Sequence, residues 1–133
     1  MIRQIGHVCV RVSNIDQTIN FYHKQLGLPM KIQYEKEGKV ILVLFEIGNM
    51  TYLEANLAKT VLPNPGHFSL ETDDIDQFMC EMKLQGIVCS EKSMGCEGAW
   101  QTWVKDPDGN NFEIQQYMPS CGYYKGGAYQ ANW

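Results

Sequence analysis

One twelve-residue pattern occurs twice in this chain, and that repeat constrains the fold more than any other feature. GHVCVRVSNIDQ covers residues 6–17 and GHFSLETDDIDQ covers residues 66–77, with Gly, His, Ile, Asp and Gln identical in register. The whole chain has 133 residues, one domain's worth and too short for two large independent domains. The repeat therefore predicts a single domain, residues 1–133, built from two half-size modules that share one core.

The first half has the pattern of one strand, one helix and three further strands. In VCVRV, β-branched residues alternate with other residues at the period of a half-buried strand. Ser13 then offers an N-cap, apolar residues follow at helical spacing from Ile15 to Leu26, and Gly27 ends the helix. Three strands separated by glycine-bearing turns are predicted next: KIQYE, KVILVLFEI and MTYLEANL.

The second half repeats this order. A strand at 67–72 precedes a helix that Asp73 and Asp76 would cap and Gly86 would end; the strands predicted after it are IVCSEK, AWQTWVK and NFEIQQY. We therefore predict an α+β fold of two βαβββ modules, about residues 1–58 and 66–118, joined by the proline-bearing connector KTVLPNPG. The aromatic tail at 119–133 has no periodicity and is typical either of a mobile terminus or of an arm packed on a neighbour.

Composition and charge exclude several classes of function. Eleven basic and fifteen acidic residues give a net charge of −4, so we expect no nucleic-acid partner. No apolar run approaches the roughly 20 residues that span a bilayer, and no signal peptide is recognisable, so we expect no membrane association. The five cysteines have neither paired spacing nor a CxxC motif, which favours reduced thiols and a cytoplasmic location.

Two histidine–glutamate pairs recur at matching places in the two halves. His7 precedes Glu54 by 47 residues and His67 precedes Glu113 by 46, with each His opening the first strand of its module and each Glu midway along the last. Strand alternation places each of them on the polar face, opposite the apolar face that would pack against the helix. Singly, such a His is more often a structural residue and such a Glu a solvated one.

If the polar faces share a concave surface, two imidazoles and two carboxylates converge. Two carboxylates in a partly dry cleft repel each other unless a cation lies between them. His7, Glu54, His67 and Glu113 are therefore candidate ligands of one divalent metal, with Ni, Co, Zn, Fe and Mn all compatible. Four other residues that stand out in the sequence are not counted among the candidate ligands. His23 is expected at the surface, Cys9 would face the cleft, and Trp100 and Trp103 are expected in the core, with pocket lining as the less favoured role.

Four blocks of the chain resemble, in order, the vicinal oxygen chelate superfamily, which includes glyoxalase I, bleomycin-resistance proteins, fosfomycin-resistance proteins and extradiol dioxygenases. They are GHVCVRVSNIDQTINFYHKQLGL, YLEANL, GHFSLETDDID and VKDPDGNNFEI, and the resemblance covers about residues 4–118. It implies paired βαβββ modules that curve into an open eight-stranded barrel-like sheet around the metal site. Glyoxalase I is the member that takes a ligand from the fourth strand, where Glu54 stands here.

The resemblance to glyoxalase I implies further properties. The metal would be nickel or cobalt, the protein would be a homodimer whose sites draw ligands from both chains, and Glu113 would be the catalytic base with Glu54 as its counterpart. Arg11 falls where an arginine binds the carboxylate of glutathione. The asparagine expected after the fourth-strand Glu is replaced by Ala58, with Asn56 nearby, and SMGCEGAW lacks the expected lysine, so a thiol other than glutathione stays open.

The function expected from these features is that of a metal-dependent lyase of the lactoylglutathione lyase type. It would convert the hemithioacetal of a 2-oxoaldehyde and a thiol into an α-hydroxy thioester, through an enediolate. Two alternatives stay open. One is another metal reaction on the same scaffold, either extradiol ring cleavage or thiol transfer to fosfomycin. The other is a ligand-binding or resistance domain without catalysis.

Overall fold

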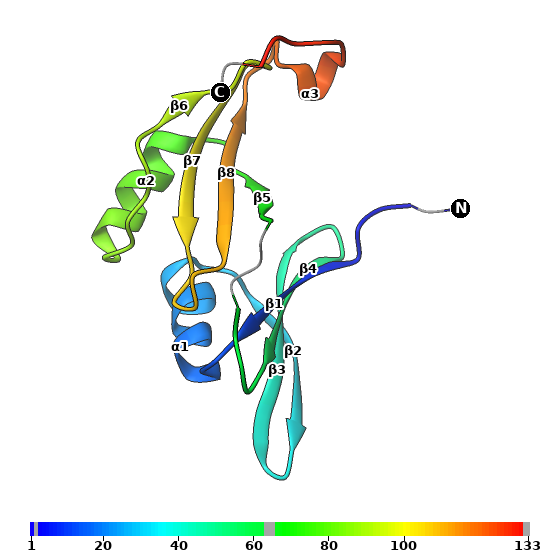
Figure 1. Cartoon of the computed structure of the whole chain (residues 1–133), viewed down its shortest axis with the longest axis vertical. Coiled ribbons are helices and arrows are strands. Elements are labelled where there is room, and N and C mark those ends of the chain that lie inside the picture. The colour runs from blue at the N-terminus through cyan, green and yellow to red at the C-terminus, as the bar shows by residue number, and fades with distance from the viewer. Residues whose placement is uncertain (2, 63–65, 132–133) are drawn as a thin grey trace. The chain divides into compact units, whose positions relative to one another are not determined.

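The computed structural model describes residues 1, 3–62 and 66–131, and the chain divides into two compact units (Figure 1). Unit 1 comprises Met1–Gly66 together with Asp106–Asn110, and unit 2 comprises His67–Lys105 together with Asn111–Trp133. The predicted proline-bearing connector lies partly outside the described residues, as does Trp133 of the tail.

Unit 1 is a four-stranded sheet with one helical segment. Its elements are β1 (His7–Val12), α1 (Ile15–Ile19), η1 (Asn20–Gln25), β2 (Met30–Lys36), β3 (Lys39–Gly48) and β4 (Thr51–Leu57). The strand order is β1-β4-β3-β2, with β1 and β4 parallel and the other pairs antiparallel. The predicted helix therefore has the expected extent, but its second half, η1, is a π-helix, and both Phe21 and Tyr22 are buried.

Unit 2 has the same topology. Its elements are β5 (Phe68–Glu71), α2 (Ile75–Leu84), β6 (Ser93–Met94), β7 (Ala99–Lys105), β8 (Asn111–Tyr117) and α3 (Gly122–Lys125). The strand order is β5-β8-β7-β6, again with the first pair parallel. The α+β class and the two βαβββ modules are thus confirmed, with the strands in two four-stranded sheets.

The core of each unit forms from alternate strand residues, as the period-2 patterns predict. In unit 1 the fully buried apolar residues include Val10, Val12, Val43, Phe45, Leu53 and Ala55, all with no accessible surface. In unit 2, Phe112 and Ile114 of β8 are buried with Ile75 of α2, and the rings of Phe68 and Phe112 stack at 5.3 Å. Burying one face of a strand leaves its opposite face for polar groups, which positions the candidate ligands.

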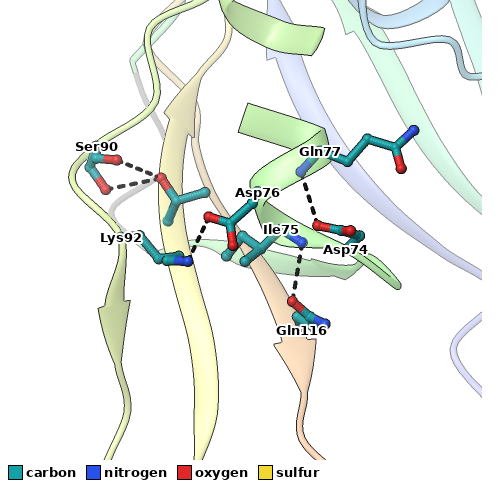
Figure 2. Close-up of polar contacts among 8 residues, drawn as sticks. Asp74, Ile75, Asp76, Gln77, Ser90, Lys92 and Gln116 are labelled. Carbon is teal, nitrogen blue, oxygen red and sulfur yellow. Dashed lines mark hydrogen bonds and ion pairs between the residues drawn. The ribbon is translucent and has the colours of Figure 1, made fainter. Parts of the chain in front are cut away.

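Both helices are capped one residue later than predicted. The side chain of Asn14, and not Ser13, accepts from the backbone N of Gln17. In α2 the cap is Asp74, which accepts from the N of Gln77 (Figure 2). The residue with extended backbone before the first helical turn makes the cap, and in each half that is the second of two competent neighbours.

The predicted strand at 87–92 is wrong; the sixth strand is the two-residue β6 at Ser93–Met94. Ser90 explains the difference. Its backbone N donates to the O of Trp103, its Oγ accepts from the N of Trp103, and its O accepts from Thr102 Oγ1. A side chain thus takes part in the contact with β7 where a ladder of backbone bonds would otherwise run.

The turn DPDGNN, part of a sequence block shared with the superfamily, lies largely in unit 1 and forms hydrogen bonds to other residues of that unit. The buried Asp106 carboxylate accepts from Tyr22 Oη at 2.9 Å, and from the backbone N and Nδ2 of Asn110 at 2.8 Å each. Asp108 accepts from the backbone N and Oγ of Ser13. Burial and the Asp106 carboxylate raise the pKa of Tyr22 well above its usual value, so the hydroxyl stays a donor. The DPDGNN turn therefore has a structural role.

The aromatic tail folds back on unit 2. Cys121 is buried, the short helix α3 follows it, and the ring of Tyr123 stacks on Tyr117 of β8 with centroids 4.2 Å apart. Burial is the largest cause that raises the pKa of Tyr117 to about 12, with Tyr123 contributing. None of the helices in the described parts of the chain is long and apolar enough to cross a membrane.

Candidate metal centre

The first His–Glu pair lies on the polar face of β1 and β4. These strands are parallel, with His7 opposite Tyr52 and Cys9 opposite Glu54 in register. His7 therefore reaches Glu54 diagonally, and the distance from its Nε2 to Glu54 Oε2 is 3.7 Å. The His7 side chain is about half exposed and Glu54 is mostly covered, so the pair lies at the surface with its carboxylate inward.

The second pair has the same arrangement in unit 2. Ser69 of β5 is opposite Glu113 of β8, and His67 stands just before β5. His67 Nε2 lies 4.0 Å from Glu113 Oε2, with the same two atoms facing each other as in unit 1. Glu113 is only 9% exposed against 18% for Glu54, so the carboxylate of unit 2 is the drier of the two.

The spacing of both pairs suits two ligands of one cation better than a hydrogen bond. Distances of 3.7 and 4.0 Å exceed the usual range for N–H···O bonds. Two donors at roughly 2.1 Å from a common ion lie about 3–3.5 Å apart, so a small closure brings either pair into range. Imidazole nitrogen with carboxylate oxygen is a donor set that suits divalent transition metals. The residues of each pair therefore fit a divalent cation.

Each unit taken alone supplies only part of a coordination shell. Across residues 1, 3–62 and 66–131, no group of three or more His, Cys, Asp or Glu side chains gathers as a metal site would require. Catalytic metal sites of the zinc type use three protein ligands and an open position. One His–Glu pair therefore supplies fewer protein ligands than such a site uses.

The surroundings of Glu113 make its carboxyl more basic than usual. Burial raises the pKa of its carboxyl, and the nearby Glu97 raises it further, while His67 and the Ser69 hydroxyl act in the opposite direction. Removing water around a carboxylate disfavours its charged form and so makes it more basic. A carboxylate with a raised pKa accepts a proton from carbon more readily than an ordinary surface glutamate.

Cys9 lies on the polar face beside Glu54, as strand alternation predicts. Burial raises the pKa of its thiol, and the hydrogen bond and negative charge of Glu54 raise it further. The thiol is therefore kept protonated. That state disfavours Cys9 as a metal ligand, because metals bind the thiolate.

Trp103 was expected mainly in the core, and that expectation is wrong. It is half-buried, lies opposite Glu113 in the β7–β8 register, and packs edge-to-face on the His67 ring at 4.7 Å. Counting back from the DPDGNN turn would have found it, because a hairpin pairing Lys105 with Asn111 also pairs Trp103 with Glu113. Unit 1 has Leu44 at the corresponding position opposite Glu54.

The remaining predicted residues are also located. Arg11 and Asn56 are both exposed and are paired in the β1–β4 register, on the same face as His7 and Glu54. Their side chains are therefore accessible to a ligand near the first pair. His23 is exposed as predicted, and its Nδ1 lies 2.8 Å from the O of Leu28.

Each of the two βαβββ units presents one His–Glu pair at an equivalent place. The family model of the Glyoxalase/Bleomycin resistance protein/Dioxygenase superfamily matches residues 4–114. The chain belongs to this superfamily.

Individual relatives show how broad the superfamily is. The chain is 29% identical to a virulence protein of Salmonella typhimurium, over 89% of this chain and 87% of that one. It is 28% identical to a lactoylglutathione lyase of Arabidopsis thaliana, over 89% of this chain but only 46% of the plant protein, so the chain spans about half of that relative. A glyoxalase family protein of Bacillus anthracis has the same fold, with a TM-score of 0.77, 21% identity and coverage of 89% and 98%.

Proposed function

We propose that this protein is a metal-dependent isomerase of the glyoxalase I type, acting on the hemithioacetal of a 2-oxoaldehyde and a thiol. The observation that carries the proposal is the duplicated His–Glu pair, with Nε2 facing Oε2 in both units. In this proposal His7, Glu54, His67 and Glu113 hold one divalent cation, nickel or cobalt in preference to zinc, iron or manganese. When bound, the cation supplies Lewis acidity that stabilises negative charge on the substrate oxygens.

Glu113 is the proposed base. Its carboxylate removes the proton from the substrate carbon that bears the hydroxyl and the sulfur, and returns that proton to the neighbouring carbonyl carbon. The hydroxyl proton passes from the oxygen of the first carbon to that of the second, so the first carbon becomes the thioester carbonyl and the second becomes the carbinol. The reaction is therefore an isomerisation without a co-reactant. The raised pKa of Glu113 supports this role, since the same group has to accept and then release a proton. Glu54 is its counterpart at the first pair.

Arg11 and Asn56 are the proposed substrate-binding residues. Both are exposed beside the first pair, and a guanidinium forms paired hydrogen bonds with a carboxylate. The substrate thiol therefore carries a carboxylate in this proposal. Ala58 and the SMGCEGAW segment depart from glutathione-type sites. The identity of the thiol therefore has to be found by assaying a panel of thiols.

The proposed assembly is a cytoplasmic homodimer in which the two units of each chain form one domain. The similarity to a lactoylglutathione lyase about twice as long supports a dimer, because two copies of this chain approach the length of that protein. Cys80, Cys89, Cys96 and Cys121 are free thiols, which supports a reducing compartment.

The direct test is elemental analysis of the purified protein, followed by assays of methylglyoxal with a panel of carboxylate-bearing and neutral thiols. Chelation should abolish thioester formation, and nickel or cobalt should restore it. Binding of metal without turnover on any thiol of the panel would contradict the isomerase assignment and favour a ligand-binding domain. Oxygen uptake with iron would instead favour a dioxygenase.

A further inference from the structure

The folded tail borders a cavity of about 240 Å³ in unit 2 that is largely open to solvent. Its lining consists of Glu97, Gly122, Tyr123, Gly126, Gly127 and Tyr129. None of the proposed metal ligands lines it, so this cavity is separate from the candidate metal centre. Two of these residues are tyrosines, three are glycines and one is acidic.

The structure fixes both tyrosine rings in place. One face of Tyr123 is covered by Tyr117, since the two rings stack within 14° of parallel. Tyr129 donates from its hydroxyl to the O of Gly126 at 3.1 Å. Its ring also lies where a side chain at position 122 would project: a Cβ built on Gly122 would stand 2.7 Å from Tyr129 Cε2. Gly122 is therefore what allows the Tyr129 ring to close over α3.

Glu97 is held at the rim of the same cavity. Its backbone O accepts from the N of Gly122 at 2.7 Å, which ties the loop before β7 to α3. The Cys96 thiol, a weak donor, donates to the Glu97 carboxylate at 3.6 Å. This carboxylate forms no ion pair within the described parts of the chain. The cavity thus carries a negative charge that no cation of these residues neutralises.

We propose that this cavity binds an organic cation, such as an alkylated ammonium group. The electron-rich faces of tyrosine rings attract a cation through their quadrupole, and a carboxylate at the rim adds a direct charge interaction. Glu97 is the sole charged residue in the described lining, so an anionic ligand would meet repulsion without any compensating group. The inference goes beyond the proposed isomerase function and requires no metal.

The test is an NMR titration of the full, metal-free chain with two ligands of the same shape, choline and its neutral isostere 3,3-dimethylbutan-1-ol. Choline is expected to bind at least about fivefold more tightly, because the two ligands differ mainly in charge. The shifted amides should be those of Gly122, Gly126 and Gly127. Equal affinities, or binding of neither ligand, would overturn the proposal.

Two variants test the residues. Glu97→Gln keeps the shape of the lining and should remove the preference for choline over the isostere. Gly122→Ala should displace the Tyr129 ring, which is the end of a flexible side chain, and so weaken choline binding while the amide spectrum stays that of a folded protein. An unchanged preference for choline in the first variant, or unchanged choline affinity in the second, would contradict the site.

Two further variants serve as matched controls. Tyr34→Leu removes an exposed tyrosine of β2 in unit 1 and should leave choline binding intact. His67→Ala removes a proposed metal ligand and should also leave it intact, which separates failure of the isomerase proposal from failure of this one. Loss of choline binding in either control would overturn the assignment to the tail cavity.

Discussion

Units 1 and 2 have the same strand order and the same His–Glu pair, yet they surround their glutamates differently. Glu54 lies beside the Cys9 thiol and opposite Leu44, whereas Glu113 lies beside Ser69 and opposite Trp103 and is more deeply buried. In unit 2 the ring of Trp103 also packs edge-to-face on His67. Duplication thus supplies a matched His–Glu pair in each unit, while divergence of the neighbours leaves the Glu113 carboxyl more buried and raises its pKa.

The largest expected difference between the units is catalytic. Glu113→Gln should lower kcat by about 10²- to 10⁴-fold, the usual contribution of a positioned acid–base group. Glu54→Gln should cost less, since it removes a ligand but not the base. The measurement is steady-state kinetics at saturating metal, with metal content determined for both variants. A greater loss in Glu54→Gln would reverse the proposed roles of the two glutamates.

The DPDGNN turn should account for the largest loss of stability. Asp106→Ala removes the acceptor of Tyr22 Oη and of both Asn110 donors, leaving buried polar groups unpaired. The expected cost is about 3 kcal/mol in the free energy of unfolding, measured by urea denaturation. Asp73→Ala, at an exposed position of α2's leading turn, is the matched control and should change stability by less than about 0.5 kcal/mol. Similar losses in the two variants would show that the Asp106 contacts contribute little.

Replacing Trp103 with Leu gives unit 2 the residue that unit 1 has opposite its glutamate, where Leu44 stands. The lost edge-to-face contact with His67 should lower stability by about 1 kcal/mol and also weaken metal binding. Trp100→Leu is the control on the same strand, because that ring contacts Lys92 instead of a candidate ligand. It should lower stability without changing metal affinity, as followed by calorimetric titration with nickel. Equal metal affinity in all three proteins would show that Trp103 does not support the site.

The smallest expected effect is on the titration of Glu113. In the metal-free protein the pKa of Glu113 is raised, first by burial and then by Glu97, so its carboxyl should titrate at a pH above the usual pKa of glutamate, as followed by NMR. Glu97→Gln removes one source of the increase and should move this titration to lower pH. A shift to higher pH would contradict the role of Glu97.

The raised pKa also fixes the sign of a stability effect. In the metal-free protein Glu113 contributes stability that is fully present below its unfolded pKa and is lost as pH rises through its folded pKa. Metal-free Glu113→Gln should therefore be at least as stable as the parent at neutral pH. This makes it a suitable variant for the kinetic comparison.

Local patterns predicted most of the fold but not the details that depend on contacts across the chain. The repeat and the alternation around His7 and His67 were sufficient for two βαβββ modules and for the direction of the candidate ligands. The choice of Asn14 over Ser13 as a cap depends on which residue is extended, and Ser13 is engaged by Asp108, 95 residues away. A contact over this sequence distance cannot be predicted from the residues around Ser13.

In the candidate site, too, local patterns predict some residues while others depend on contacts across the chain. Its His and Glu residues could be named because each has a copy in the other half. Trp103 has no aromatic copy in unit 1 and emerges only from the register of β7 and β8. The missing strand at 87–92 and the folded tail likewise depend on Ser90 and Tyr117, whose partners lie on other elements.

We propose that the two His–Glu pairs bind one cation together, and calorimetric titration of the metal-free protein with nickel tests this proposal most directly. The predicted result is one ion per chain, with affinity reduced by more than about 100-fold in both His7→Ala and His67→Ala, because even outer-shell changes cost 10- to 100-fold. Unchanged affinity in either variant, or two independent ions per chain, would contradict a shared site.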